Sequence, residues 1–474
     1  MFHGLLPAYW LTLHGLISAL AVLTYVIASH VMHQRRHPAA AIAWVLFILL
    51  MPYVALPAFL LFGSRKRARA RGLPLPSAPS ASSLSNASAS ASWPVQTIKA
   101  LGQPEPAPYR DFALHVDGKQ ALAALWNVLD GAEHSIDVCT FILGRDDIGE
   151  AVIAKLCAKA KSGVKVRLLL DGLGSLMAGR PRMRALTDCG SEFLLFVPPL
   201  HSPLNGRTNL RDHRKMLVVD AAHDGRRLWC GGRNLASEYF EGRNDVQAWH
   251  DLSFDLRGPL VLQAQALFEH DWAFASGRRN VALPPPATWL PADVTNAPTA
   301  QLIASGPDQV DDTVYSVLVT AAYRAQTRIA LVTPYFVPDT ALLAALCLAA
   351  RRGVIVDLLI PAKSNHRMSD VARNRALRTL ADAGAHIWLA PNMMHAKLAV
   401  VDDILALAGS ANLDSRSLFL NYELMFAFHN APDIARFRNW FDVERQSAAV
   451  YVADRPGFLR DVAEGAVLWL GFQL

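Results

Sequence analysis

Acidic side chains are absent from the start of this 474-residue sequence, and charged side chains are scarce throughout. Residues 1–72 contain no Asp or Glu, and only 18% of the whole chain is charged while 52% is hydrophobic. A disordered protein combines low hydrophobicity with high net charge, so this composition excludes that class. The surplus of apolar residues instead favours membrane segments.

Cysteine pairs of the kind that hold zinc are also missing. The five cysteines are an odd number, and no two of them form a C-x-x-C motif. The sequence therefore argues against a disulfide framework and against a cysteine-based zinc site, and a reducing compartment is expected.

A basic excess is lacking over most of the chain. There are 46 Lys and Arg residues against 40 Asp and Glu, and seven of the basic residues lie within residues 1–72, so the remainder is close to neutral. A nucleic-acid-binding domain usually carries a basic excess. Nucleic acid is therefore not expected as a partner.

Two long uncharged runs lie near the amino terminus, at residues 9–32 and 39–63. About 20 apolar residues suffice to cross a bilayer as a helix, so both runs are predicted to be transmembrane helices of a membrane anchor spanning residues 1–72. The alternative for the first run is a signal peptide, which would need a basic start and a cleavage site, but the first ten residues contain no Lys or Arg. Pro52 and Pro57 indicate a kink or an interfacial helix end, and a re-entrant or surface helix is the alternative for the second run.

Basic residues between positions 65 and 71 follow the second run. The positive-inside bias favours a cytoplasmic location for this cluster and for everything after it, with Arg35 and Arg36 then facing outward. The cluster also suits anionic lipid head groups. Residues 73–94 are rich in Ser, Ala and Pro and are expected to form a flexible linker.

The chain beyond residue 95 repeats itself. SIDVCTFILGRDDIG and SGVKVRLLLDGLGS flank a helical stretch in the first half, and RIALVTPYFVPDTAL and RGVIVDLLIPAKS do so in the second. Strand–helix–strand units that occur twice predict an α/β fold with two repeated domains, residues 95–290 and 291–474. Each domain is expected to contain a mixed sheet flanked by helices, and a pseudo-two-fold axis is expected to relate the two.

Each half also contains the pattern His-x-Lys-(x)4-Asp, then a GGRN or GSAN element, then a carboxylate that opens a strand. The pattern comprises His213, Lys215 and Asp220 in the first half and His395, Lys397 and Asp402 in the second; the later carboxylates are Asp251 and Glu423.

The chemistry of this pattern suits a phosphate group. His and Lys at alternate positions of a strand share one face, so two such strands can bring two imidazoles and two ammonium groups into one pocket. One histidine can attack phosphorus while the other protonates the leaving oxygen. The lysines, together with Asn234, Asn412 and Ser410, are the predicted phosphate-binding groups. A metal is not expected, because the histidines form no H-x-x-x-H or H-E-x-x-H motif and the lysines would repel a cation.

At these residues the sequence resembles the phospholipase D superfamily and, within it, the bacterial cardiolipin synthases. The segments that carry the resemblance are NLRDHRKMLVVD, GGRNLASEYF, WHDLSFDLRGP, TPYFVPD, HAKLAVVDD and GSANLDSRSLFLNYEL, together with the second apolar run. The resemblance covers nearly all of the chain from residue 95 onward. The long Pro/Ala/Ser-rich linker departs from it.

The resemblance implies a transfer reaction on phosphatidylglycerol that needs no cofactor. A histidine would take a phosphatidyl group and release glycerol, and a second phosphatidylglycerol would then attack the phosphohistidine to give cardiolipin. The implied nucleophile is His213 and the implied general acid is His395. Asp251 is expected to orient His213 and Glu423 to orient His395. Asp220 and Asp402 belong to the catalytic motif but are suspected of stabilising local geometry.

Several alternatives remain open from the sequence. With water or another alcohol as the acceptor, the same chemistry would make the protein a phospholipase D-type hydrolase or a different phosphatidyltransferase. A nuclease of the superfamily and a non-catalytic membrane scaffold are the other classes considered, and the intact motifs argue against the scaffold. The expected location is the bacterial inner membrane, with a multi-pass anchor, cytoplasmic catalytic domains and anionic lipids as partners.

Overall fold

The computed structural model of the chain describes residues 5–31, 38–62, 92–179, 183–198, 209–242, 247–277, 297–309 and 311–470. The chain divides into two compact units. An amino-terminal unit comprises Met1–Arg71 with Pro199–Leu210, and a main unit comprises Gly72–Pro198 with Arg211–Leu474. Arg35, Arg36, the basic cluster at 65–71 and nearly all of the predicted linker lie outside the described residues.

Among its described residues, the amino-terminal unit contains the helices α1 (Leu5–Val31), α2 (Pro38–Leu50) and α3 (Pro52–Phe62). They share a small core in which the rings of Tyr25 and Phe59 lie 5.0 Å apart. The second apolar run, expected to form one helix, is divided at Met51. Pro52 explains the division, because proline lacks an N–H and disfavours the helical conformation of the residue before it.

Among the residues that the structure describes, no helix combines the length and the hydropathy needed to cross a membrane. The prediction of two transmembrane helices is therefore not confirmed.

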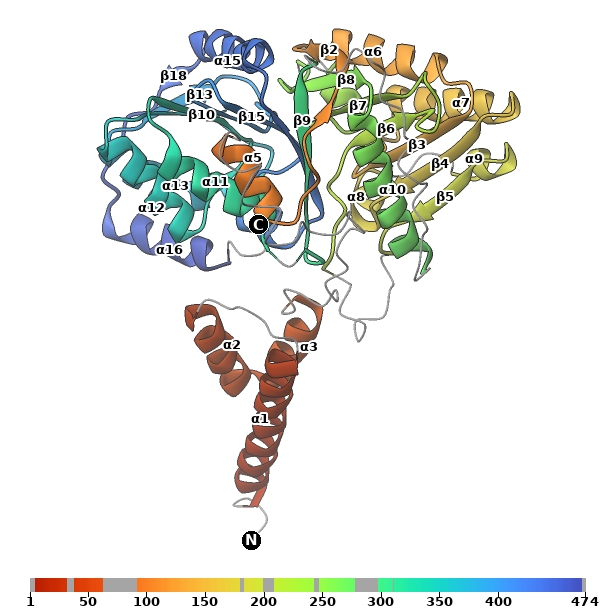
Figure 1. Cartoon of the computed structure of the whole chain (residues 1–474). Coiled ribbons are helices and arrows are strands. Elements are labelled where there is room, and N and C mark those ends of the chain that lie inside the picture. The colour runs from red at the N-terminus through yellow and green to blue at the C-terminus, as the bar shows by residue number, and fades with distance from the viewer. Residues whose placement is uncertain are drawn as a thin grey trace, which may run out of the picture. The chain divides into compact units, whose positions relative to one another are not determined.

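The first sheet of the main unit has seven strands in the order β2-β8-β7-β6-β3-β4-β5 (Figure 1). The parallel pairs are β3 with β4 and β4 with β5, and the other neighbours are antiparallel. The strands are β2 (Arg110–His115), β3 (Ser135–Thr140), β4 (Lys165–Leu170), β5 (Glu192–Leu195), β6 (Met216–Val219), β7 (Arg227–Gly231) and β8 (Ser253–Arg257). The helices of this half are α6 (Gly118–Asp130), α7 (Asp147–Lys161), α8 (Gly172–Met177), α9 (Arg184–Asp188) and α10 (Leu260–Ser276), with the short η2 (Ser237–Tyr239).

The second sheet has nine strands in the order β1-β9-β17-β15-β14-β10-β12-β13-β18. Its strands are β1 (Ala107–Pro108), β9 (Thr299–Ser305), β10 (Arg328–Val332), β12 (Ile355–Pro361), β13 (His386–Ala390), β14 (Leu398–Val401), β15 (Leu405–Gly409), β17 (Glu423–Phe428) and β18 (Ala449–Val450); β11 (Phe336–Val337) pairs separately with β16 (Leu413–Asp414). The helices are α5 (Trp93–Ala100), α11 (Thr313–Arg324), α12 (Thr340–Arg351), α13 (Arg367–Asp382), α14 (Ser415–Phe419), α15 (Ala431–Gln446) and α16 (Phe458–Leu470).

The two sheets confirm the repeat. Without the edge strands β1 and β18, the second sheet has the order of the first, strand for strand, including the parallel run β10-β12-β13. The sequence repeat also recurs in the helix caps. The carboxylates of Asp146 and Asp339 accept the backbone N–H of Gly149 and Leu342, and thereby cap the starts of α7, which follows β3, and α12, which follows β10 and β11. The expected mixed α/β sheets flanked by helices are therefore present twice.

The segment between residues 93 and 108 belongs with the second sheet, although the sequence-based boundary at residue 95 places it in the first domain. β1 pairs antiparallel with β9, with Ala107 opposite Ala300. Ile98 of α5 is fully buried and packs against Val314 and Val317 of α11 in the core of the second half. An apolar side chain on a short helix needs a surface that covers it, and α11 provides that surface.

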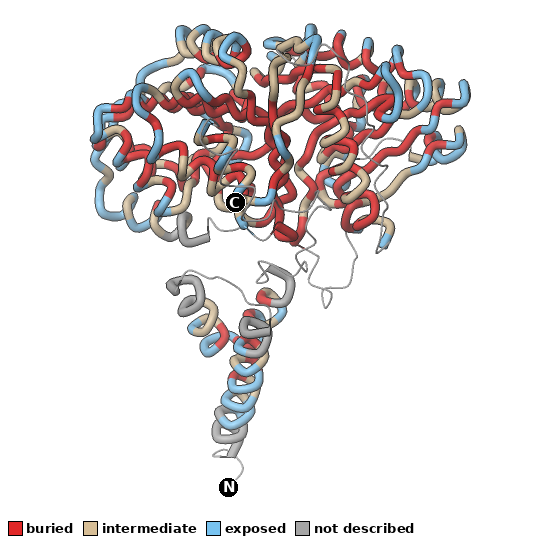
Figure 2. Tube along the Cα trace, in the orientation of Figure 1, coloured by how far each residue is buried: buried red, intermediate tan, exposed pale blue. Residues whose placement is uncertain are grey.

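Phenylalanine side chains fill the junction between the two halves of the main unit. The ring of Phe254 in β8 lies 5.5 Å from that of Phe426 and 5.4 Å from that of Phe428, both in β17. Figure 1 shows the two sheets side by side with β9 near the junction, and Figure 2 shows the strands as the buried interior of both halves. The junction is therefore a packed core that holds the two repeats in one register.

Candidate active site

Each His-x-Lys pair lies immediately before a central strand of its sheet, β6 in the first half and β14 in the second. The Lys215 and Lys397 side chains are almost fully buried. Lys215 Nζ donates to the backbone carbonyl of His213 at 2.6 Å, and Lys397 Nζ donates likewise to the carbonyl of His395. Each lysine side chain thus lies beside the histidine two residues before it, which is consistent with alternate residues of an extended chain sharing one face.

The two repeats contact each other through two equivalent backbone bridges. Asp212 forms a parallel bridge with Tyr422, and His250 forms one with Met394. The His213 N–H donates to the Tyr422 carbonyl at 2.9 Å, and the His395 N–H donates to the His250 carbonyl at 2.6 Å. Tyr422 and His250 are the residues just before Glu423 and Asp251, so each bridge delivers a histidine of one repeat to the carboxylate of the other.

The histidine–carboxylate pairs are therefore crossed. His213 Nδ1 lies 3.1 Å from the carboxylate of Glu423, and His395 Nδ1 lies 2.7 Å from Asp251 Oδ2. The expectation that Asp251 orients His213 and Glu423 orients His395 is wrong. When Nδ1 carries the proton and donates to the carboxylate, Nε2 presents a lone pair to the pocket. Both pairs have the geometry for that tautomer.

The two carboxylates are held differently. Glu423 accepts a hydrogen bond from Ser410 Oγ at 2.5 Å and from Asn421 Nδ2 at 3.3 Å. In the first repeat the position of Ser410 is occupied by Gly232, where an added Cβ would lie 2.2 Å from Asp251 Oδ1. Ser410 was predicted to bind phosphate, but its hydroxyl is directed at Glu423 and is a support for that carboxylate.

The two asparagines predicted to bind phosphate are buried beside the histidines' strands. Asn234 Nδ2 donates to the Tyr239 hydroxyl at 2.8 Å, and its Oδ1 accepts the Ile142 N–H at 3.3 Å. Asn412 Oδ1 is buried and makes no hydrogen bond with any described residue. The proposed phosphate contacts of both residues remain predictions.

Burial dominates the electrostatics of the four motif side chains. It lowers the pKa of His395 to about 3, with Lys397 adding to the effect, and it lowers the pKa of Lys397 to about 7 and of Lys215 to about 8. It lowers the pKa of His213 as well, against the opposing charge of Glu423. A site that disfavours its own positive charges to this degree is suited to an anion, which would restore the charged forms of the lysines.

The carboxylates keep their negative charge. Burial alone would raise the pKa of Asp251, but the neighbouring His395 and Lys397 outweigh it and lower the pKa. The same balance, with His213 and Lys215, lowers the pKa of Glu423. Both groups therefore remain ionised and can hold an imidazolium when one forms.

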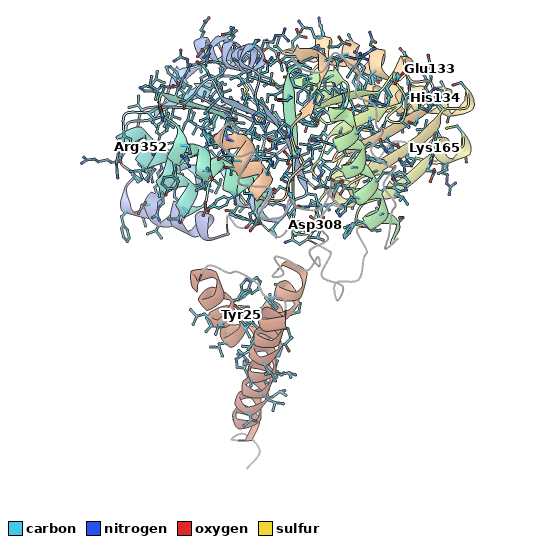
Figure 3. The ribbon with its side chains drawn as sticks, viewed as in Figure 1. Tyr25, Glu133, His134, Lys165, Asp308 and Arg352 are labelled. Carbon is cyan, nitrogen blue, oxygen red and sulfur yellow. The ribbon has the colours of Figure 1, made fainter. Side chains whose placement is uncertain are left out.

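The motif aspartates lie outside the site. Asp220 and Asp402 follow the far ends of β6 and β14 and have left-handed backbone conformations, with φ of 49° and 48°. Asp220 accepts the backbone N–H groups of Glu133, His134 and Ser135, and Figure 3 marks the first two at the upper right of the main unit. Asp402 binds the equivalent amides before β10. The suspected role in local geometry fits these contacts, and a catalytic role for the two aspartates stays a prediction.

Arg214, between His213 and Lys215 in sequence, was missed as a functional residue. Its guanidinium is fully buried, and Nη1 donates to both carboxylate oxygens of Asp271 in α10 at 2.5 Å. It also donates to the backbone carbonyl of Glu423 at 3.1 Å, and so fixes the carboxylate that orients the first histidine. The second repeat has Ala396 at this position. The only sequence signal was the difference between H-R-K and H-A-K.

Two more buried carboxylates surround this guanidinium. Burial and the charge of Asp271 raise the pKa of Asp212 to about 8, and burial raises the pKa of Asp308. Figure 3 shows Asp308 at the lower edge between the two halves, and His270 Nε2 lies 3.6 Å from its Oδ2. Within the described residues, no group of three or more His, Cys, Asp or Glu side chains has an arrangement suited to a metal ion.

Comparison with known proteins gives the family. The family model described as "Cardiolipin synthase, PLD-like domain" matches residues 125–272 and 318–444, and the model described as "Phospholipase_D-nuclease N-terminal" matches residues 19–64. Cardiolipin synthase 1 of Bacillus cereus is 30% identical over 463 residues, which cover 92% of this chain and 89% of the relative. Cardiolipin synthase A of Pseudomonas putida is 30% identical and covers 86% of each chain.

The fold has a solved counterpart. Phosphatidylserine synthase of Haemophilus influenzae superposes with a TM-score of 0.59 at 14% identity, over 80% of this chain and 100% of that one. Two repeated mixed sheets with paired His-x-Lys motifs define an enzyme of the phospholipase D superfamily. Within that superfamily, this chain belongs to the cardiolipin synthase family.

Proposed function

We propose that the protein is a membrane-anchored phosphatidyltransferase that converts two molecules of phosphatidylglycerol into cardiolipin and glycerol through a phosphohistidine. The observation that carries the proposal is the crossed arrangement, in which two histidines, each bonded at Nδ1 to a carboxylate of the other repeat, lie with two buried lysines. The family relatives are named as cardiolipin synthases, which supports the choice of substrate.

In the first half-reaction, His213 Nε2 attacks phosphorus of the first phosphatidylglycerol. The phosphorus–nitrogen bond forms while the bond from phosphorus to the glycerol head-group oxygen breaks. His395 must enter this step as an imidazolium, which Asp251 and the negative charge of the bound phosphate stabilise. It donates its Nε2 proton to that oxygen, so glycerol leaves as a neutral alcohol. Lys215 and Lys397 offset the charge on the phosphoryl oxygens.

In the second half-reaction, a primary hydroxyl of a second phosphatidylglycerol attacks the phosphohistidine. His395, now neutral, accepts the hydroxyl proton as the oxygen–phosphorus bond forms. The phosphorus–nitrogen bond breaks, and cardiolipin and free His213 result. With water in place of the second lipid, the same steps would give phosphatidic acid, which is the alternative hydrolase reaction.

The assignment of His213 as nucleophile rests on the different surroundings of the two imidazoles. Lys397 Nζ lies 2.9 Å from His395 Nδ1 and 3.0 Å from His395 Nε2, so its ammonium group lies against that imidazole. Among the described residues, no hydrogen bond involves His213 Nε2, and Glu423 behind it is supported by both Ser410 and Arg214. A phosphodiester that draws Lys397 toward its oxygens would release His395 Nε2 for its role as acid.

The test is turnover of labelled phosphatidylglycerol by purified full-length protein in detergent. Cardiolipin and glycerol in equal amounts are expected. EDTA is expected to leave the rate unchanged, because the two lysines buried beside the histidines would repel a cation. Phosphatidic acid with glycerol as the sole products would replace the proposal with hydrolysis. Acid-quenched enzyme should carry the label on the peptide that contains His213, and label on the His395 peptide alone would reverse the two roles.

The membrane anchor is part of the proposal. Its support is the apolar sequence of α1, α2 and α3, many of whose large apolar side chains are exposed, including Trp10, Leu16 and Leu50. The sequence of basic residues from 65 to 71 supports an inner-membrane location with the repeats in the cytoplasm. Protease added outside intact spheroplasts should leave the main unit uncut, and its digestion would reverse this orientation.

A further inference from the structure

Helix α16 has the reverse of the usual arrangement of polar and apolar faces. A surface helix normally buries its apolar stripe and exposes its charges. Here the acidic side chains face inward onto α13, where Asp461 pairs with Arg375 at 2.8 Å and Glu464 pairs with Arg378 at 2.5 Å. Glu464 retains only 2% of its surface exposure. Ion pairs therefore help attach the described part of this helix to the main unit.

The outward side of α16 is apolar. The exposed fractions are 81% for Phe458, 83% for Leu459 and 52% for Val462. Leaving side chains of this size in water forgoes the free energy that burying them would release. Clustered exposure of this kind marks an interaction surface.

The exposed apolar residues continue onto the start of α13, where Met368 and Val371 are 43% and 37% exposed. Exposed basic residues accompany them, namely Lys363, Arg367 and Arg455. Basic side chains next to apolar ones suit a bilayer that contains anionic phospholipid, since the apolar groups enter the acyl region and the cations meet head-group phosphates.

This surface lies at the end of the sheet that carries the site. α13 begins just after the carboxyl end of β12, where Leu359 is level with Val332 of β10, and Val332 pairs in turn with Leu398, the neighbour of Lys397. In the first repeat the equivalent position is taken by α8, where Leu176 and Met177 are 54% and 78% exposed. Figure 1 places α8, α13 and α16 in the lower half of the main unit, with α15 at its upper edge.

We propose that the outer face of α16, with the first turn of α13, is a bilayer-docking surface that seats the main unit on anionic phospholipid independently of the amino-terminal unit. The inference deepens the proposed function and rests on it for the choice of lipid. A second copy of the chain is the less suitable occupant, because stable protein interfaces use about 20–30 residues on each side and this face offers a few residues on one helix.

The test is photolabelling of the full-length protein in vesicles of phosphatidylcholine and phosphatidylglycerol that include a phosphatidylglycerol with a diazirine in its acyl chain. Adducts are expected on the peptide that contains Phe458 and Leu459. Val443 is a matched control, since it is 61% exposed and belongs to α15, the helix that Figure 1 shows at the opposite edge of the main unit. Absence of adducts on α16, or equal labelling of the Val443 peptide, would overturn the proposal.

A double variant, Phe458→Ser with Leu459→Ser, gives a kinetic test. We expect the apparent KM for phosphatidylglycerol in vesicles to rise roughly tenfold, which corresponds to about 1.4 kcal/mol of lost docking. The kcat for dissolved short-chain phosphatidylglycerol should stay unchanged, as should both values in Val443→Ser. Concentration-dependent self-association that the double variant abolishes would assign the face to a second copy instead. Photolabelling does not depend on turnover. If the proposed reaction is wrong but the docking surface is right, the adducts will still form while the turnover assay fails, so the two failures can be told apart.

Discussion

Glu423 contacts the imidazole of His213, a residue 210 positions earlier in the chain, while the carboxylate nearest to His213 in the repeat pattern, Asp251, contacts His395. Each carboxylate thus controls the tautomer of a histidine in the other repeat. Neither repeat contains a complete histidine–carboxylate pair of its own, so the position of one half relative to the other determines the reactivity of both.

The crossed pairs predict different defects for the two carboxylate variants. In Glu423→Gln the amide cannot hold a protonated His213, and turnover should fall roughly 10–100-fold. In Asp251→Asn the fall should be similar with phosphatidylglycerol, because leaving-group protonation by His395 is impaired. With a phosphatidyl ester of p-nitrophenol, which needs no acid, Asp251→Asn should recover its burst of nitrophenol and Glu423→Gln should not.

Glu444→Gln is the control for this pair, since Glu444 accepts a hydrogen bond from His250 Nδ1 at 2.8 Å and, among the described residues, bonds neither motif histidine. Its turnover should stay close to that of the unaltered protein. A recovered burst in Glu423→Gln, with none in Asp251→Asn, would mean that His395 and not His213 attacks phosphorus.

The buried lysines predict a pH-dependent response to anions. Burial lowers the pKa of Lys397 to about 7 and of Lys215 to about 8, so both are charged at lower pH and neutral at higher pH. Sulfate keeps its charge over this range and should raise Tm more at a pH just below 7 than at a pH above 8. Differential scanning fluorimetry measures the shift, and a double variant with Lys215→Met and Lys397→Met should show no pH dependence of it.

Without an anion, the folded protein should become more stable as the pH rises, which is the opposite direction to the sulfate effect. Between about pH 7 and 10.5, the unfolded chain keeps a proton on Lys397 that the folded chain has released. Stability rises with pH wherever the unfolded state binds more protons. The free energy of unfolding of the anion-free protein should therefore increase with pH over this range, and Lys397→Met should flatten the increase. A fall across the same range would contradict the lowered pKa.

Gly232 lies so close to Asp251 that no larger residue is expected to be tolerated at position 232. Gly232→Ala places a Cβ 2.2 Å from Asp251 Oδ1, so the carboxylate must move away from His395 and turnover should be lost. Gly457→Ala meets no atom within 4 Å and is the matched control. Ser410→Ala removes one hydrogen bond to the charged Glu423, which contributes about 1.5–3 kcal/mol, and should slow turnover less than Gly232→Ala does.

Asp220→Asn should affect stability and not chemistry. The variant keeps a residue that tolerates a left-handed conformation but weakens the acceptor for the amides of Glu133, His134 and Ser135, at a cost of about 1–3 kcal/mol. Tm should fall while kcat per folded molecule stays constant. Asp224→Asn, in the same turn but exposed, is the control. A large loss of kcat at unchanged Tm would return Asp220 to the catalytic group.

The Arg214–Asp271 pair predicts that the losses in the free energy of unfolding caused by the two single variants will not add in the double variant. Either Arg214→Met or Asp271→Leu leaves one buried charge without its partner and should destabilise the protein by about 3–5 kcal/mol. The double variant removes both charges and should recover most of that loss in denaturant unfolding. Its turnover should remain reduced, because the backbone carbonyl of Glu423 has lost its donor. Full recovery of turnover would show that Arg214 serves the fold alone.

The strands, the caps and the shared face of each His-x-Lys pair were predictable because they depend on local sequence. Strand periodicity and Asp146 and Asp339 at helix starts act over a few residues. The partner of each histidine was not predictable in this way. Asp251 follows His213 in the first repeat, and Glu423 follows His395 in the second. This order along the chain does not reveal whether each histidine pairs with the carboxylate of its own repeat or of the other.

Other features depended on tertiary contacts. Ser410 looked like a phosphate ligand because it follows glycine in GSAN, yet its hydroxyl reaches Glu423. Asp402 looked catalytic by its place in the motif, but β14 carries it away from His395 and toward the amides before β10. The role of Arg214 required knowledge of α10, which supplies Asp271.

The pairing of β1 with β9 has a consequence for synthesis on the ribosome. β1 is translated before any strand of the first sheet, but its partner follows only after the whole first repeat has been made. The nascent first repeat must therefore fold while the segment ahead of it, including the apolar Ile98, still lacks its binding surface. The pairing of β1 with β9 can form only after β9 has been translated. The segment that contains β1 and Ile98 therefore waits for the second repeat before it can dock.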